Sequence, residues 1–120
     1  MTEYHLFTMK YDIVLISFPF DDLFTTKVRP AVCLTEPIGP YNHVIMAFIT
    51  SNIQNAKEQS DLIINPTDEN FDLTGLMVSS VVKLHRLTTI PINLIKRNLG
   101  KLNENHIAEI KNKLRNLLDL

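Results

Sequence analysis

The chain has 120 residues, of which 45% are hydrophobic and 21% are charged, a composition typical of one globular domain. Its formal net charge of −1 argues against a protein that binds nucleic acid through a broad basic surface. The single cysteine, Cys33, can form neither an internal disulfide nor a cysteine-based metal site. No apolar run approaches the ~20 residues of a membrane-spanning helix, so we expect one cytoplasmic domain, residues 1–120, without membrane anchor, metal or cofactor.

The charges are distributed unevenly along the chain. Residues 1–91 carry six Lys and Arg against ten Asp and Glu, whereas residues 92–120 carry six against three. A local basic site therefore remains compatible with the composition, although charges on a helix often form only its solvated face.

The first half of the chain predicts three strands. After an N-terminal arm of residues 1–10, the β-branched and aromatic run 12–18 ends at a proline, which cannot donate to a sheet. A connection over 20–29 leads to a second strand, 31–35, which "EPIGP" closes with a turn. Residues 43–50 form the third. Because these strands are almost continuously apolar, we expect a sheet covered on both faces or rolled into a small barrel.

The second half predicts further strands and one helix. Residues 51–60 form a polar loop, 61–65 a short strand, and 76–84 with 86–90 either two strands or one bent strand. After Pro91 the pattern becomes helical. For a helix over 102–119, Asn103 is a suitable N-cap and apolar residues recur at helical spacing. The fold class is therefore α+β and mostly β, an antiparallel sheet closed by an amphipathic C-terminal helix.

Three common kinds of site are excluded by the sequence. The glycines are isolated, so there is no glycine-rich phosphate loop. The four histidines are far apart and lack the spacing of a metal site. A serine nucleophile on a strand-to-helix turn is also missing.

The segments "DIVLISFPFDDLFTTKVRPAVCLTE", "VIMAFITS", "GLMVSSVVKLHRLTTI" and "LGKLNENHIAEI", taken together and in this order, resemble the PemK/MazF family of toxins of type II toxin–antitoxin pairs. The resemblance implies a small SH3-like antiparallel β-barrel with a C-terminal helix. It also implies a homodimer, a metal-independent endoribonuclease that cleaves single-stranded RNA, and an antitoxin protein as partner.

Arg29 matches the family's catalytic arginine. Pro30 has a fixed φ and restricts the residue before it to extended conformations, so the guanidinium is carried on a stiff backbone. A planar guanidinium suits the charge that develops on a phosphate attacked by a 2′-OH. Lys27 is expected to add phosphate binding nearby. From the residues alone, a surface ion pair is the alternative for Arg29.

Thr50 and Ser51 end the third predicted strand. By resemblance, Thr50 is the threonine that accompanies the arginine, and hydroxyls of this kind bind phosphates. Without the resemblance, the two residues would be interpreted as the end of a strand and the start of a turn.

The chain departs from the family pattern after "VV". Several members carry Arg-x-Asp there, whereas this chain has Lys83 and His85, followed by Arg86. Lys83 and Arg86 are predicted to bind phosphate. His85 is predicted to transfer protons, since a histidine titrates near neutral pH. Asp22, in the loop before the arginine, is a second candidate for the base.

The polar loop 51–61 carries Asn and Gln amides that suit the reading of RNA base edges, and its alternative role is a plain solvated connection. Two other functions stay open for the whole chain. The same barrel could serve as a non-catalytic module that binds RNA or protein. It could also poison a protein target such as gyrase, as the CcdB family does.

Overall fold

The computed structural model describes residues 10–19 and 26–120. Within these ranges the chain forms the strands β1 (Asp12–Pro19), β2 (Thr26–Cys33), β3 (His43–Thr50), β4 (Asp61–Ile64), β5 (Ser80–Pro91) and β6 (Ile95–Lys101), and the helix α1 (Glu104–Leu118). Short 3₁₀ helices, η2 (Ile53–Asn55), η3 (Phe71–Thr74) and η4 (Ile92–Leu94), lie in the connections.

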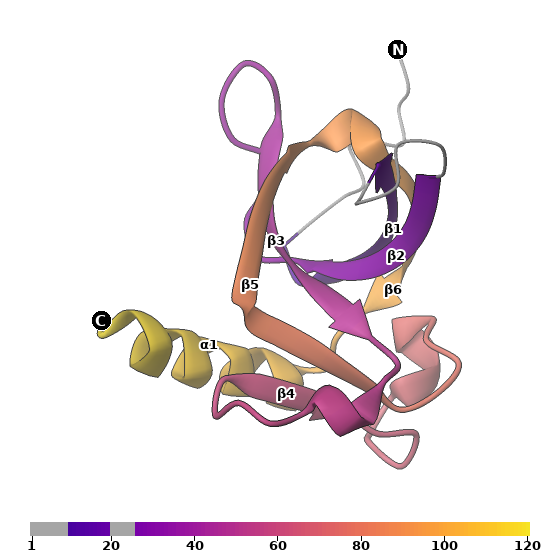
Figure 1. The fold of residues 1–120 in the computed structure, drawn as a ribbon, viewed down its shortest axis with the longest axis vertical. Helices are drawn as coiled ribbons and strands as arrows, with labels where there is room; N and C mark the ends of the chain where they lie inside the picture. Colours follow the sequence, from indigo (N-terminus) through magenta and orange to yellow (C-terminus); the bar gives the residue numbers. More distant parts are fainter. Residues whose placement is uncertain (1–9, 20–25) are drawn as a thin grey trace.

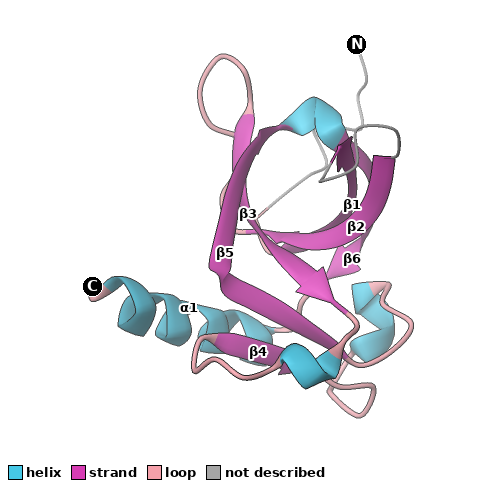
Figure 2. Ribbon diagram, viewed as in Figure 1, coloured by secondary structure: helices cyan, strands magenta, loops and turns pink. Residues whose placement is uncertain are grey.

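The strands form one antiparallel sheet in the order β4-β5-β3-β2-β1-β6. The sheet curls around on itself, and α1 lies outside the curl beside β4 and β5 (Figures 1 and 2). This confirms the prediction of a mostly β fold with a C-terminal helix. β4 and β6 are the two edges of the sheet, so the backbone ladder of the curl is not closed.

Both faces of the sheet are covered, which explains why the strand sequences are almost continuously apolar. On one face, Ile13 and Val32 belong to a buried cluster that includes Ile110 of α1. On the other face, their neighbours Val14 and Ala31 belong to a second cluster inside the curl. Successive residues of a strand thus enter different cores, as the two-residue period requires.

The helix α1 begins as its sequence predicts. The Asn103 side-chain oxygen accepts a hydrogen bond from the backbone N–H of His106 at 2.7 Å, which satisfies one of the free amides of the first turn. Leu102 and Ile107, on either side of the cap, both pack against the core under the helix. His106 Nε2 lies 2.8 Å from the Asp68 carboxylate, so the first turn is also held to the loop after β4.

The second strand begins earlier than predicted. β2 extends from Thr26 because it pairs with β1 from Pro19 opposite Thr26 to Ile13 opposite Val32. The prediction of a connection over 20–29 was therefore wrong at 26–29, where charged residues and a proline obscured the strand. Arg29 consequently stands inside a strand rather than in front of one.

The prediction that the pattern becomes helical after Pro91 was wrong over 95–101, although Ile92–Leu94 form the 3₁₀ helix η4. Residues 95–101 form the edge strand β6, which pairs with β1 through two shifts of register. Its exposed Lys96, Arg97 and Asn98 break the apolar alternation that identifies a strand, and edge strands often carry such charges. At the other end of β5, the alternative of one bent strand is correct, although it starts at Ser80 rather than at residue 76.

Across the described residues, no helix has the length and apolar character needed to cross a bilayer.

Candidate functional site

Arg29 and Thr50 stand at the point where β2 and β3 separate. The two strands are paired over only three residues each, and the last pair is Ala31 with Phe48. Arg29 and Thr50 each lie two residues beyond that pair, at the same end of the ladder, where the strands diverge (Figure 1). Because residues two apart share a face, both follow the face on which Ala31 and Phe48 pack.

The surroundings of these two residues leave them accessible. Arg29 is exposed and Thr50 is half-buried. Pro30, which has no N–H to donate, stands where pairing with β3 stops, so a proline costs little there. Thr50 Oγ1 accepts a hydrogen bond from the backbone N–H of Asn52 at 3.1 Å, which leaves the hydroxyl proton available as a donor.

A guanidinium and a hydroxyl on one face of diverging strands suit an anionic ligand such as a phosphate. Ser51 is exposed directly after Thr50. Lys27 belongs to β2, where it pairs with Phe18, but its side chain lies outside the described part of the structure. Asp22 also lies outside the described residues. The roles predicted for Arg29, Thr50, Ser51, Lys27 and Asp22 stay predictions.

The segment Lys83–Arg86 occupies an irregular part of β5. Ile49 of β3 faces Val82, but two residues earlier Ala47 faces Leu87, so two steps along β3 correspond to five along β5. This bulged stretch coincides with the bend of β5 in Figure 1. Bulges redirect side chains, so the alternation of a regular strand does not extend across this segment.

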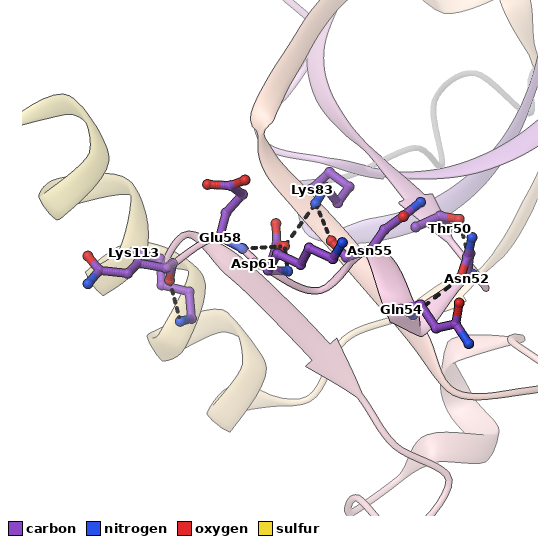
Figure 3. Close-up of polar contacts among 10 residues, drawn as sticks. Thr50, Asn52, Gln54, Asn55, Glu58, Asp61, Lys83 and Lys113 are labelled. Carbon is purple, nitrogen blue, oxygen red and sulfur yellow. Dashed lines mark hydrogen bonds and ion pairs between the residues drawn. The ribbon is translucent and has the colours of Figure 1, made fainter.

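Lys83 is buried and has partners inside the protein. Its ammonium lies 2.8 Å from Asp61 Oδ2 and donates to the backbone carbonyl of Asn55 at 2.7 Å (Figure 3). Asp61 stands directly opposite Lys83 in the β4–β5 ladder. The charge of Lys83 is thus compensated internally, and its predicted role as a phosphate ligand stays a prediction.

The electrostatics of Asp61 reflect this environment. Burial by itself raises the pKa of the carboxyl group. The hydrogen bonds and charge of Lys83, with the backbone amides of Glu58 and Lys57, favour the ionised form more strongly, so the pKa lies below its usual value. The Asp61 carboxylate is therefore ionised at neutral pH.

His85 is exposed and lies in different surroundings. It lines a surface cavity of about 540 Å³ between the end of the 51–60 loop and the second half of α1, together with Glu58, Gln59, Ser60, Lys113, Asn116 and Leu117. Neither Arg29 nor Thr50 lines this cavity. Arg86 is exposed next to it in sequence. Proton transfer by His85 and phosphate binding by Arg86 stay predictions.

Other chemistry finds little support among the described residues. No group of three or more His, Cys, Asp and Glu side chains in these ranges is arranged to hold a metal ion. Cys33 is buried in β2, and burial raises the pKa of its thiol to about 12. It is therefore a core residue and not a nucleophile.

The sequence analysis missed Asp61, which was assigned only to a strand. An acidic residue at the head of the apolar run "DLII" was a signal, since a carboxylate is buried only when it is paired. Its partner could not be identified before the β4–β5 register was known.

Comparison with known proteins identifies the family and the fold. Residues 9–118 match the family described as the PemK-like, MazF-like toxin of type II toxin-antitoxin systems. The chain belongs to this family. Among curated proteins, none matches the sequence.

Solved structures of low sequence identity share the fold of this PemK/MazF-family chain. The Mycobacterium tuberculosis toxin MazF-mt6 is 22% identical with a TM-score of 0.69, and the match covers 91% of this chain and 97% of that one. An endoribonuclease in complex with its cognate antitoxin, from a mycobacterial species, is 15% identical with a TM-score of 0.66, over 93% and 95%. In a MazE-MazF structure from Deinococcus radiodurans, the matched chain is 19% identical with a TM-score of 0.69, over 93% and 96%. The predicted fold and family are thereby confirmed.

Proposed function

We propose that this protein is an endoribonuclease toxin that cleaves single-stranded RNA without a metal ion, with Arg29 and Thr50 on the scissile phosphate. The observation that carries the proposal is the position of these two residues, each two steps beyond the last β2–β3 pair and on one face. Membership of the toxin family and the fold shared with a mycobacterial endoribonuclease add support.

In the proposed reaction, the 2′-OH of a ribose attacks the adjacent phosphorus as the bond to the 5′-oxygen of the next nucleotide breaks. The products are a 2′,3′-cyclic phosphate and a 5′-hydroxyl. Negative charge grows on the phosphorane oxygens in the transition state, where the Arg29 guanidinium stabilises it. The Thr50 hydroxyl donates a hydrogen bond to a phosphate oxygen and orients the phosphate for in-line attack.

Proton transfer completes this proposal. One group takes the proton of the 2′-OH, and one gives a proton to the leaving 5′-oxygen. His85 and Asp22 are the candidates. Lys27, Ser51 and Arg86 contribute binding to neighbouring phosphates.

The partners follow from the family. Solved relatives of this fold are complexes of an endoribonuclease with its cognate antitoxin and of MazE with MazF. We expect this chain to act as a cytoplasmic homodimer and to be inhibited by a cognate antitoxin that covers the Arg29 face.

Incubation of the purified protein with a long single-stranded RNA in EDTA tests the activity. Discrete cuts with 2′,3′-cyclic phosphate ends, lost in Arg29→Ala and retained in Arg97→Ala, are expected. Arg97 is an exposed arginine of β6 and serves as the matched control. Intact RNA in the presence of folded wild-type protein would exclude the enzyme.

A second candidate function is a non-catalytic module that binds RNA or protein through the same face. Two observations favour it: the internal pairing of Lys83 with Asp61, and the location of His85 in a cavity lined by neither Arg29 nor Thr50. The same incubation separates the candidates, because a non-catalytic module leaves the RNA uncut. A filter-binding measurement then shows whether the module binds RNA.

A further inference from the structure

The 51–60 loop connects β3 to β4 and carries several amide side chains. The Asn52 side-chain oxygen caps the 3₁₀ helix η2 by accepting from the Gln54 backbone N–H at 3.2 Å. Asn52, Gln54 and Asn55 are all exposed. The loop starts directly after Thr50, whose hydroxyl oxygen accepts a hydrogen bond from the Asn52 backbone. Its conformation therefore decides where these amides stand relative to the proposed phosphate site.

Lys83 holds the middle of this loop from the side of β5. The lysine reaches out from β5 and donates to the main-chain carbonyl of Asn55 (Figure 3). Since the acceptor is a backbone atom, the contact fixes the course of the chain and leaves the Asn55 amide group outside. The lysine side chain is 11% exposed, so water competes little for this bond.

The second half of the loop is held by Asp61. One carboxylate oxygen accepts the backbone N–H groups of Lys57 and Glu58, each at 3.0 Å, as well as the Lys83 ammonium. The carboxylate is 3% exposed, and its other oxygen is buried without a hydrogen-bond partner among the described residues. The hydrogen bonds that Asp61 accepts among the described residues thus all come from the loop backbone and from Lys83.

A weaker contact comes from the helix. Lys113 of α1 donates to the main-chain carbonyl of Gln59 at 3.0 Å, in an exposed position. The loop is therefore fixed at its centre and second half by a buried ion pair, and at its end by a surface hydrogen bond.

We propose that Lys83 and Asp61 are positioning residues that set the 51–60 loop in the conformation that selects RNA bases beside the cleaved phosphate. This inference rests on the proposed function. Amide groups can read the edges of unstacked bases, but only from a fixed position, because a mobile loop loses the discrimination to conformational entropy. The buried Lys83–Asp61 pair supplies that rigidity, because both side chains form hydrogen bonds with the backbone of the loop.

The test uses two variants and one library. Lys83→Met removes the ammonium while keeping an apolar stem, but it leaves the Asp61 charge buried without its partner. Lys83→Met combined with Asp61→Asn removes the ammonium contacts without that charge, and the asparagine oxygen can still accept from the loop. The substrate is a single-stranded RNA library with a randomised centre, and the cut products are sequenced. Lys111→Met, at an exposed position of α1, is the matched control.

The double variant is expected to flatten the sequence preference. The ratio of kcat/KM between the best site and its single-base variants falls about tenfold, in line with one lost base contact. Amide hydrogen exchange of residues 52–60 becomes faster in the same variant. Lys111→Met changes neither measurement.

Two results would overturn the inference. Unchanged exchange in the loop means that the pair does not hold it, and faster exchange with an unchanged preference means that the loop does not select bases. If the wild-type protein cuts no RNA, the proposed function fails separately. The library is then selected by binding, and an unchanged ranking of bound sequences in the double variant overturns the inference in the same way.

Discussion

Two basic side chains of the predicted site, Arg29 and Lys83, lie in opposite surroundings. Arg29 is exposed on a regular strand, two residues beyond the end of a ladder. Lys83 is buried in a bulged strand, against Asp61 and a loop carbonyl. Both were predicted to bind phosphate from their place in the sequence.

The difference shows that the position of a basic residue in a motif does not by itself predict whether its side chain is exposed or buried. Arg29 is exposed at the surface, where a ligand can reach it, whereas the buried Lys83 ammonium is paired with internal partners. We therefore expect removal of Lys83 to lower stability most, and removal of Arg29 to lower activity most.

The largest expected effect is on the stability of Lys83→Met. This change leaves the Asp61 carboxylate buried without its partner, which costs about 3–5 kcal/mol of unfolding free energy. The combined change with Asp61→Asn recovers most of this loss. Urea unfolding followed by circular dichroism measures both, and Lys111→Met provides the reference. A loss below about 1 kcal/mol, the size typical of surface pairs, would contradict the buried-pair interpretation.

Next in size is the effect of Arg29→Ala on RNA cleavage. Loss of a group that stabilises transition-state charge is expected to lower kcat by about 10²–10³. The protein should stay folded, because the Arg29 side chain is exposed and lies outside the core. Single-turnover cleavage of a defined RNA gives the rate. Activity comparable to that of Arg97→Ala would move the catalytic cation elsewhere.

A smaller effect is expected for Thr50→Val. The change removes the proposed hydrogen bond to a charged phosphate and the acceptor of the Asn52 backbone N–H, and it lowers kcat/KM about tenfold. Thr89→Val, at an exposed threonine of β5, is the control and should cleave like the wild type. Equal rates for the two variants would remove Thr50 from the site.

The smallest expected effect is on the dependence of unfolding free energy on pH in acid. The folded-state pKa of Asp61 lies below its usual value, so its stabilising contribution is complete above the unfolded pKa of about 3.9. That contribution is lost as the pH falls through the lower, folded-state pKa. Urea unfolding between pH 2 and 7 should show a shallower acid loss in the Lys83→Met, Asp61→Asn double variant. Equal slopes would mean that other carboxylates carry the acid dependence.

Local patterns were most informative where neighbours in sequence are also neighbours in space. The Asn103 cap, the start of α1 and the strands 43–50 and 61–64 follow from local propensity and were predicted within a few residues. The edge strand β6 was missed because its charged residues form a strand only through pairing with β1.

The site divides in the same way. Arg29 and Thr50 were proposed from short motifs that resemble the family. The β2–β3 register and the regular period of both strands place the two residues on one face. The bulge in β5 interrupts that period, so the surroundings of Lys83, His85 and Arg86 could not be predicted from alternation.

The sequence by itself determined the family, the mostly β class and the capped C-terminal helix, since each depends on local chemistry or on a motif. It also predicted the pairing of Arg29 with Thr50, which stays a prediction. Only the tertiary structure decided that Lys83 turns inward to Asp61 and that His85 faces a cavity beside α1. The reason is physical: the partner of a buried charge is chosen by strand register, and the register between β4 and β5 relates residues 22 positions apart.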